Sequence, residues 1–117
     1  MPARIPRVMI DTYVLEVLMR DLTAHDKQPS AFLVFLDLWR RASSGRTRRV
    51  SASHQSMADS TGLSKSAVQM AVRTLRRRRL VQCWRASRTA VPEYAVQRPW
   101  AEQKKRRQED KRSRDES

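Results

Sequence analysis

Cysteine, glycine and aromatic residues are scarce in this chain, and each scarcity excludes something. The 117 residues include one cysteine, two glycines, three tryptophans, two tyrosines and two phenylalanines. The lone Cys83 excludes an intramolecular disulfide framework and leaves no basis for a thiolate metal cluster. Because aromatic side chains are few, we expect a core built mainly from Leu, Val, Met and Ala.

Signals for membranes and secretion are also missing. No apolar run approaches the roughly 20 residues that cross a bilayer, and the N-terminus lacks the apolar stretch and cleavage site of a secretory signal. A chain without a disulfide framework belongs by default in a reducing compartment. We therefore expect a cytoplasmic protein with no membrane partner.

Residue sets that carry catalysis or hold metals cannot be found either. The sequence has no Gly-rich phosphate loop, no paired carboxylates in its basic region and no nucleophile with an evident base. His25 and His54 are separated by 28 residues, with no third ligand at metal-binding spacing. We expect no enzymatic activity, no bound metal and no cofactor.

Positive charge, by contrast, is abundant and unevenly distributed. The formal net charge is +13, but residues 1–39 carry four basic and five acidic side chains, a net of −1. Residues 40–100 carry fourteen basic and two acidic side chains, a net of +12, and residues 101–117 a net of +2. Solubility alone does not require such asymmetry. Binding of a polyanion does, because arginines that neutralise its charges release its counterions. The charge pattern predicts a nucleic-acid partner.

The chain divides into three expected parts. Residues 1–29 hold an arm and an apolar helix, Thr12–Leu22, which we interpret as a possible homodimer contact because it carries little net charge. Residues 30–99 form the expected DNA-binding domain, opening with a helix that Ser30 can cap. Residues 100–117 form a charged tail that lacks the apolar residues needed to pack a core.

A helix-turn-helix is predicted between about Gln55 and Leu80. Ala58 is small enough for a close helix crossing, and Gly62, four residues later, tolerates the positive φ of a turn. Ser53 can cap the first helix and Ser64 the second. The buried side of that helix is predicted from apolar residues at helical spacing: Val68, Ala71, Val72 and Leu75.

The opposite side of the same helix carries side chains that can read bases. Arginine pairs with guanine and glutamine with adenine at the major-groove edges. The predicted base contacts are Ser64, Lys65, Ser66, Gln69 and Arg73. Two β-like runs follow, Val81–Trp84 and Tyr94–Val96, and predict a small hairpin. The predicted phosphate and hairpin contacts are Arg46, Arg48, Arg49, Gln55, Arg76, Arg77, Arg85 and Arg88.

The run from Met57 to Val68, continued by Ala71-Val72-Arg73-Thr74-Leu75 and by Arg79-Leu80-Val81, resembles the winged helix-turn-helix of bacterial GntR-type and MarR-type regulators. The same module is similar to that of plasmid and phage replication proteins. The resemblance, over about residues 30–97, implies a mainly α fold with a small β-hairpin wing. It also implies Lys65–Arg79 as recognition helix, Val81–Val96 as wing, and dimers on palindromic sites.

We therefore expect a nucleoid-associated transcriptional regulator that binds double-stranded DNA as a homodimer. No small-molecule effector is expected, since the chain leaves no room for a GntR-type effector domain. Two alternatives stay open. One is a plasmid or phage replication or partition factor that uses the same module. The other is an RNA-binding or interaction protein that uses the basic face.

Overall fold

The computed structural model describes residues 5–44 and 49–101, and in them the chain is mainly helical with one small sheet. The helices are an N-terminal helix (residues 12–25), α1 (Pro29–Ser43), α2 (His54–Thr61) and α3 (Lys65–Arg77). Three antiparallel strands, β1 (Arg49–Ser51), β2 (Val81–Trp84) and β3 (Glu93–Val96), pair in the order β1-β3-β2. The predicted mainly α content and the predicted hairpin are confirmed.

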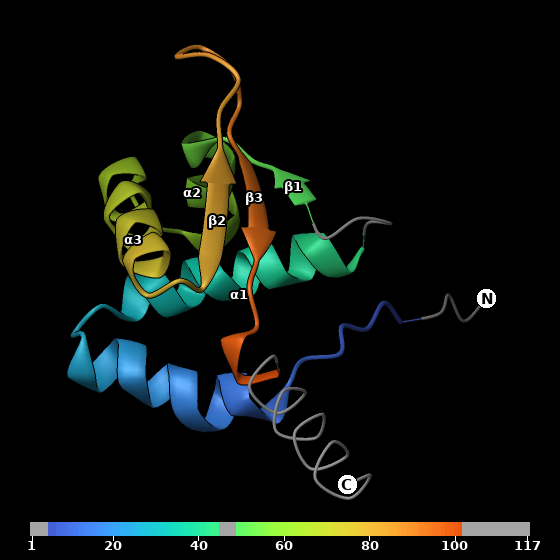
Figure 1. Ribbon diagram of the computed structural model, residues 1–117, viewed down its shortest axis with the longest axis vertical. Helices are drawn as coiled ribbons and strands as arrows, with labels where there is room; N and C mark the ends of the chain where they lie inside the picture. Colours follow the sequence, from blue (N-terminus) through green and yellow to red (C-terminus); the bar gives the residue numbers. More distant parts are fainter. Residues whose placement is uncertain (1–4, 45–48, 102–117) are drawn as a thin grey trace, which may run out of the picture.

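Helix α1 lies at the centre of the molecule. The N-terminal helix lies along one side of it, while α2, α3 and the sheet lie on the other (Figure 1). α1 is accordingly apolar around most of its circumference, and its buried apolar residues are Ala31, Phe32, Val34, Phe35, Leu38 and Trp39. Burying each large apolar side chain of this kind contributes about 1.5–3 kcal/mol, so α1 anchors the elements that pack against it: the N-terminal helix, α2, α3, β1 and β3.

The N-terminal helix is wound more loosely than a regular α-helix. Two segments, Val14–Leu18 and Asp21–His25, form π-helical turns, in which the amide of Met19 donates to the carbonyl oxygen of Val14. Its buried residues, Val14, Leu18 and Leu22, recur at every fourth position. That row would drift around a helix of 3.6 residues per turn, whereas wider turns keep it facing α1. The helix also extends beyond the predicted end at Leu22.

Local capping explains where the helices begin and end. Ser53 and Ser64 act as the predicted N-caps of α2 and α3, accepting hydrogen bonds from the amides of Ser56 and Ala67. Gly62 takes the turn between them with a φ of 78°. The expectation that Ser30 caps α1 is wrong, because α1 begins at Pro29, whose fixed φ and missing amide suit the first helical position.

The sheet turns one face towards the helices and the other outwards. Val50, Tyr94 and Cys83 are aligned across the three strands, and this row faces inwards, with Val50 and Tyr94 buried. The neighbouring row, Ser51, Glu93 and Trp84, faces the other side. The eight residues that join β2 to β3 extend the hairpin away from α1 (Figure 1).

After β3 the chain returns to the start of the N-terminal helix. The indole of Trp100 stacks on Tyr13 with ring centroids 4.8 Å apart, and its Nε1 donates a 2.9 Å hydrogen bond to Asp11. Arg98 binds the same carboxylate at 2.6 Å. Burial alone would raise the pKa of Asp11, but the hydrogen bonds from Trp100 and Arg98 outweigh it, so the pKa is lowered. Residue 100 therefore packs with the domain.

Candidate nucleic-acid interface

Helix α3 is strongly two-sided. Its buried side consists of Val68, Ala71, Val72, Thr74 and Leu75. The Thr74 hydroxyl donates a 2.6 Å hydrogen bond to the side-chain oxygen of Gln28, which ties α3 to the start of α1. Ala67 is partly buried and the other positions are exposed, so the residues predicted to read bases are presented to solvent: Ser64, Lys65, Ser66, Gln69 and Arg73. A rigid, anchored helix with a polar outer face is the geometry that major-groove recognition requires.

A groove of about 540 Å³ separates this outer face from the β2–β3 hairpin. Its walls come from three elements: His54 of α2; Gln69, Val72, Arg73 and Arg76 of α3; and Cys83, Arg85 and Tyr94 of the hairpin. A second hollow of about 340 Å³ continues it between the starts of α2 and α3 and the hairpin loop, where Gln55, Lys65 and Val91 contribute. We call the two together the basic groove.

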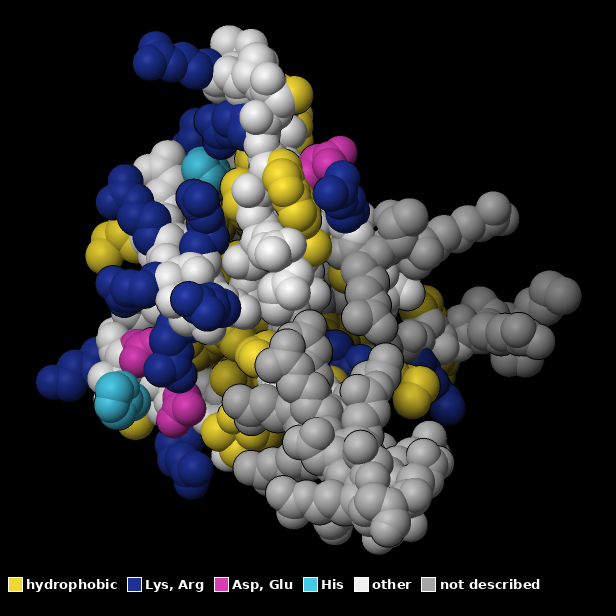
Figure 2. Space-filling view, in the orientation of Figure 1, with side chains coloured by type: hydrophobic (Ala, Val, Ile, Leu, Met, Phe, Trp, Pro, Cys, Tyr) yellow, Lys and Arg dark blue, Asp and Glu magenta, His cyan; other side chains and the backbone are white. Residues whose placement is uncertain are grey.

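Among residues 5–44 and 49–101, no acidic side chain lines the basic groove. Within the described part of the chain, Lys65, Arg73, Arg76 and Arg85 make no ion pair with a carboxylate. Figure 2 shows the consequence: Lys and Arg side chains gather along the flank formed by α3 and the hairpin. Uncompensated like charges around one groove create a positive potential that attracts anions.

Two titratable groups that line the groove, His54 and Tyr94, have shifted pKa values. The pKa of His54 is lowered by burial and by the nearby charges of Arg85 and Lys65. Burial and the neighbouring Cys83 raise the pKa of Tyr94 to about 12, although Arg85 and Arg76 act in the opposite direction. At neutral pH the imidazole and the phenol are therefore uncharged, and the formal charge around the groove is that of the lysine and arginines.

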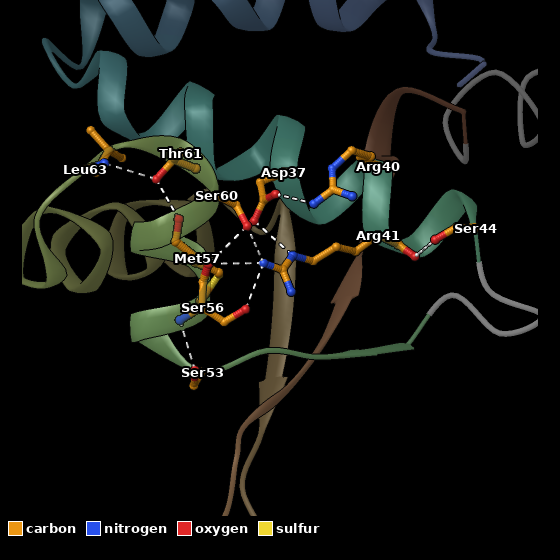
Figure 3. Close-up of polar contacts among 10 residues, drawn as sticks. All are labelled: Asp37, Arg40, Arg41, Ser44, Ser53, Ser56, Met57, Ser60, Thr61 and Leu63. Carbon is orange, nitrogen blue, oxygen red and sulfur yellow. Dashed lines mark hydrogen bonds and ion pairs between the residues drawn. The ribbon is translucent and has the colours of Figure 1, made fainter. Parts of the chain in front are cut away.

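Other arginines stabilise the fold instead. Arg41 binds the buried carboxylate of Asp37 at 3.0 Å and reaches α2, where its Nη2 donates to the carbonyl and hydroxyl of Ser56 and to the hydroxyl of Ser60 (Figure 3). Arg40 pairs with the other oxygen of Asp37. These contacts hold α2 against α1, and α3 packs against both helices.

The run of four arginines at the end of α3 is divided between these two roles. Arg76 lines the groove and Arg77 is exposed. Arg78 points the other way, 3.4 Å from Asp21 and 3.5 Å from Asp26 on the N-terminal helix. Arg79 adopts a left-handed conformation with a φ of 58°. This division follows from the helical period, which turns consecutive side chains to different sides.

The remaining predicted phosphate contacts are scattered. Arg85 and Gln55 line the basic groove, and Arg88 lies exposed in the hairpin loop. Arg49 lies elsewhere, on the outer face of the sheet, where its guanidinium stacks 4.2 Å above the ring of Trp84 and lies 3.7 Å from Glu93. Arg46 and Arg48 lie outside the described residues.

Sequence reasoning missed several groove residues, including three with titratable side chains. His54, Cys83 and Tyr94 come from α2, β2 and β3, and only the strand register brings the last two opposite each other. The alternation of β2 could have placed Cys83 and Arg85 on the same side of the hairpin. Nothing in the sequence indicated that this side faces α3.

Two further observations bear on the kind of site. In residues 5–44 and 49–101 no group of three or more His, Cys, Asp or Glu side chains is arranged to hold a metal ion. None of the helices described here is long and apolar enough to cross a membrane. Compared with known proteins, the chain matches no family model, no curated protein and no solved structure.

Proposed function

We propose that this protein is a winged helix-turn-helix protein that binds double-stranded DNA in a sequence-specific manner. In this proposal α2 and α3 form the helix-turn-helix, α3 is the recognition helix, and the β2–β3 hairpin is the wing. The order of helices and strands, the strand order β1-β3-β2 and the left-handed Gly62 between α2 and α3 support it.

One observation carries the proposal: four cations that form no ion pair within the described residues converge on one groove beside an anchored helix. They are Lys65, Arg73 and Arg76 on α3 and Arg85 on the hairpin, and no carboxylate of the described residues lines the groove with them. Arg41 and Arg78, by contrast, are engaged with acidic partners inside the fold. Phosphates placed along the groove would displace counterions from these side chains, the main source of affinity for nucleic acids.

Duplex DNA fits the arrangement better than an unspecific polyanion. Gln69 and Arg73 lie one turn apart on the exposed side of α3. Their amide and guanidinium groups have the donors and acceptors that pair with adenine and guanine in the major groove. We assign base reading to these two, with Ser66 and Lys65 beside them, and phosphate contacts to Arg76, Arg77, Arg85 and Arg88. The protein then acts as a transcriptional regulator.

Fluorescence anisotropy at fixed salt tests the assignment of base reading to Arg73. It compares a DNA duplex selected for binding to this protein with a scrambled duplex. Arg73→Ala is expected to weaken binding to the selected duplex by about 1–3 kcal/mol. The difference in binding free energy between the two duplexes should therefore become smaller. Arg40→Ala removes the same charge from α1 and serves as the matched control, because Arg40 lies outside the basic groove. Equal losses on both duplexes would reduce Arg73 to a phosphate contact. Tighter binding of a structured RNA would overturn the DNA proposal.

A further inference from the structure

One side of the N-terminal helix is exposed to solvent. Val14, Leu18 and Leu22 are buried against α1, but Leu15 and Met19, one turn apart on the other side, are 45% and 42% exposed. Wide helical turns keep positions four residues apart in straight rows. This side of the helix therefore presents two parallel rows, one containing Leu15 and Met19 and the other Glu16 and Arg20.

The charged row is unpartnered. Glu16 and Arg20 are both exposed, and neither forms an ion pair with any residue that the structure describes. Beyond them, the same row continues to Thr12 on one side and Ala24 on the other, both uncharged. The row therefore consists of one negative and one positive charge, flanked by small uncharged residues.

Such a row is complementary to itself when it is reversed. If two N-terminal helices pack antiparallel about a two-fold axis near the level of Leu18, Glu16 lies opposite the partner's Arg20, and Arg20 opposite the partner's Glu16. Both charge pairs form at once, and the exposed Leu15 and Met19 of each copy pack beside them. A two-fold contact uses the same patch on both subunits, so each favourable pair occurs twice.

We propose that the face formed by Leu15, Glu16, Met19 and Arg20 is the contact between two copies of this chain. The contact leaves the basic groove free, because α3 and the N-terminal helix lie on opposite sides of α1 (Figure 1). The formation of this contact does not depend on the proposed DNA binding.

Charge reversal tests the contact without any DNA. The mass of the full chain is measured by sedimentation equilibrium over a range of concentrations, and we expect association to twice the 13.7 kDa chain mass. Glu16→Arg and Arg20→Glu, each alone, place like charges opposite each other twice and should raise the dimer dissociation constant by at least about tenfold. An equimolar mixture of the two variants restores opposite charges at both pairs and should associate again as a heterodimer.

The mixture is the decisive arm, because neither a folding defect nor a segment of the same chain lying on this face could restore association between two different variants. Asp59→Arg reverses an exposed acid on α2 and serves as the control that should leave the mass unchanged. A full chain that stays monomeric throughout, unaltered association in the single variants, or a mixture that stays monomeric would each overturn the proposal. Since DNA is absent, a failure here leaves the DNA-binding assignment untouched.

Discussion

Nε2 of Gln69 on α3 lies 3.5 Å from Nδ1 of His54 on α2, so a proposed base-reading amide shares a polar contact with an imidazole. The charges of Lys65 and Arg85 help to lower the pKa of that imidazole in the free protein. A polyanion in the basic groove would neutralise those charges. We therefore expect the pKa of His54 to change when a polyanion occupies the groove.

DNA binding should strengthen as pH falls. Phosphates placed beside Lys65 and Arg85 raise the pKa of His54 in the complex above its value in the free protein, so binding takes up a proton between those two values. The logarithm of the association constant should then change by up to about one per pH unit in that window. Anisotropy titrations from pH 8 to pH 5.5 measure it.

His54→Gln should remove this dependence, while His25→Gln, at an exposed histidine beside Asp26, should keep it. The folding stability of the free protein should depend on pH in the opposite direction, falling as pH falls. A lowered pKa means that His54 stabilises the fold above its ordinary value of 6.5, and that this contribution is lost as pH falls below it. An unchanged pH dependence of DNA binding in His54→Gln would show that His54 does not take part in the interface.

Two arginines of the β-rich part should differ in their effect on salt dependence. Arg85 lines the basic groove, whereas Arg49 stacks on Trp84 at the outer face of the sheet. Arg85→Ala should weaken binding to all duplexes and reduce the slope of log K against log salt by about one. Arg49→Ala should leave the slope nearly unchanged. The reverse order would place the DNA along the outer face of the sheet instead.

Neighbouring arginines of α1 should differ in their effect on stability. Arg41→Ala leaves Asp37 with one fewer partner and removes a hydrogen-bond donor from Ser56 and Ser60, which should cost about 2–3 kcal/mol of unfolding free energy. The side chain of Arg40 is 57% exposed, so Arg40→Ala should cost less than about 1 kcal/mol. Urea denaturation compares the two variants, and equal losses would contradict the network shown in Figure 3.

Two residues with positive φ flank the proposed recognition helix and should respond in opposite ways to substitution. Gly62→Ala forces an alanine into a left-handed conformation and should cost about 1 kcal/mol, although nothing lies within 4 Å of the added Cβ. Arg79 already has this strain, at the end of α3 where the amide of Leu80 donates to the carbonyl of Leu75. Arg79→Gly should therefore stabilise by about 0.5–1 kcal/mol. Midpoints of denaturation at constant slope measure both.

Residue 100 should mark where the C-terminal segment becomes necessary for stability. A chain that ends at Ala101 keeps the stacking of Trp100 on Tyr13 and its hydrogen bond to Asp11. Ending the chain at Pro99 removes both and should cost about 2–3 kcal/mol. Thermal unfolding of the two truncated chains measures this difference in stability. Equal stabilities would mean that Trp100 contributes nothing to the fold.

The sequence predicted the parts of the fold that depend on local chemistry. Ser53 and Ser64 as caps, Gly62 in the turn and the buried period of α3 are local signals, and all are present in the structure. It did not predict the π-helical turns near Val14, because they arise from packing a four-residue period against α1.

Contacts between distant segments were equally beyond the sequence. Arg49 belongs to a basic run, and its stacking on Trp84 depends on the order of strands rather than on any neighbour in the chain. His54 joins the basic groove because the hairpin folds back over the start of α2. Charge counts therefore predicted which partner to expect, and only the tertiary structure separates arginines that face the groove from those that hold the fold together.

Selection from a random library of DNA duplexes is the direct test of sequence-specific binding by α3. After several rounds at moderate salt, we expect one enriched motif with adenine and guanine at its core. The Arg73→Ala and Gln69→Ala proteins should each lose preference at a different position of that motif. A library that shows no enrichment, together with equal affinity for duplex DNA and structured RNA, would contradict sequence-specific DNA binding by α3.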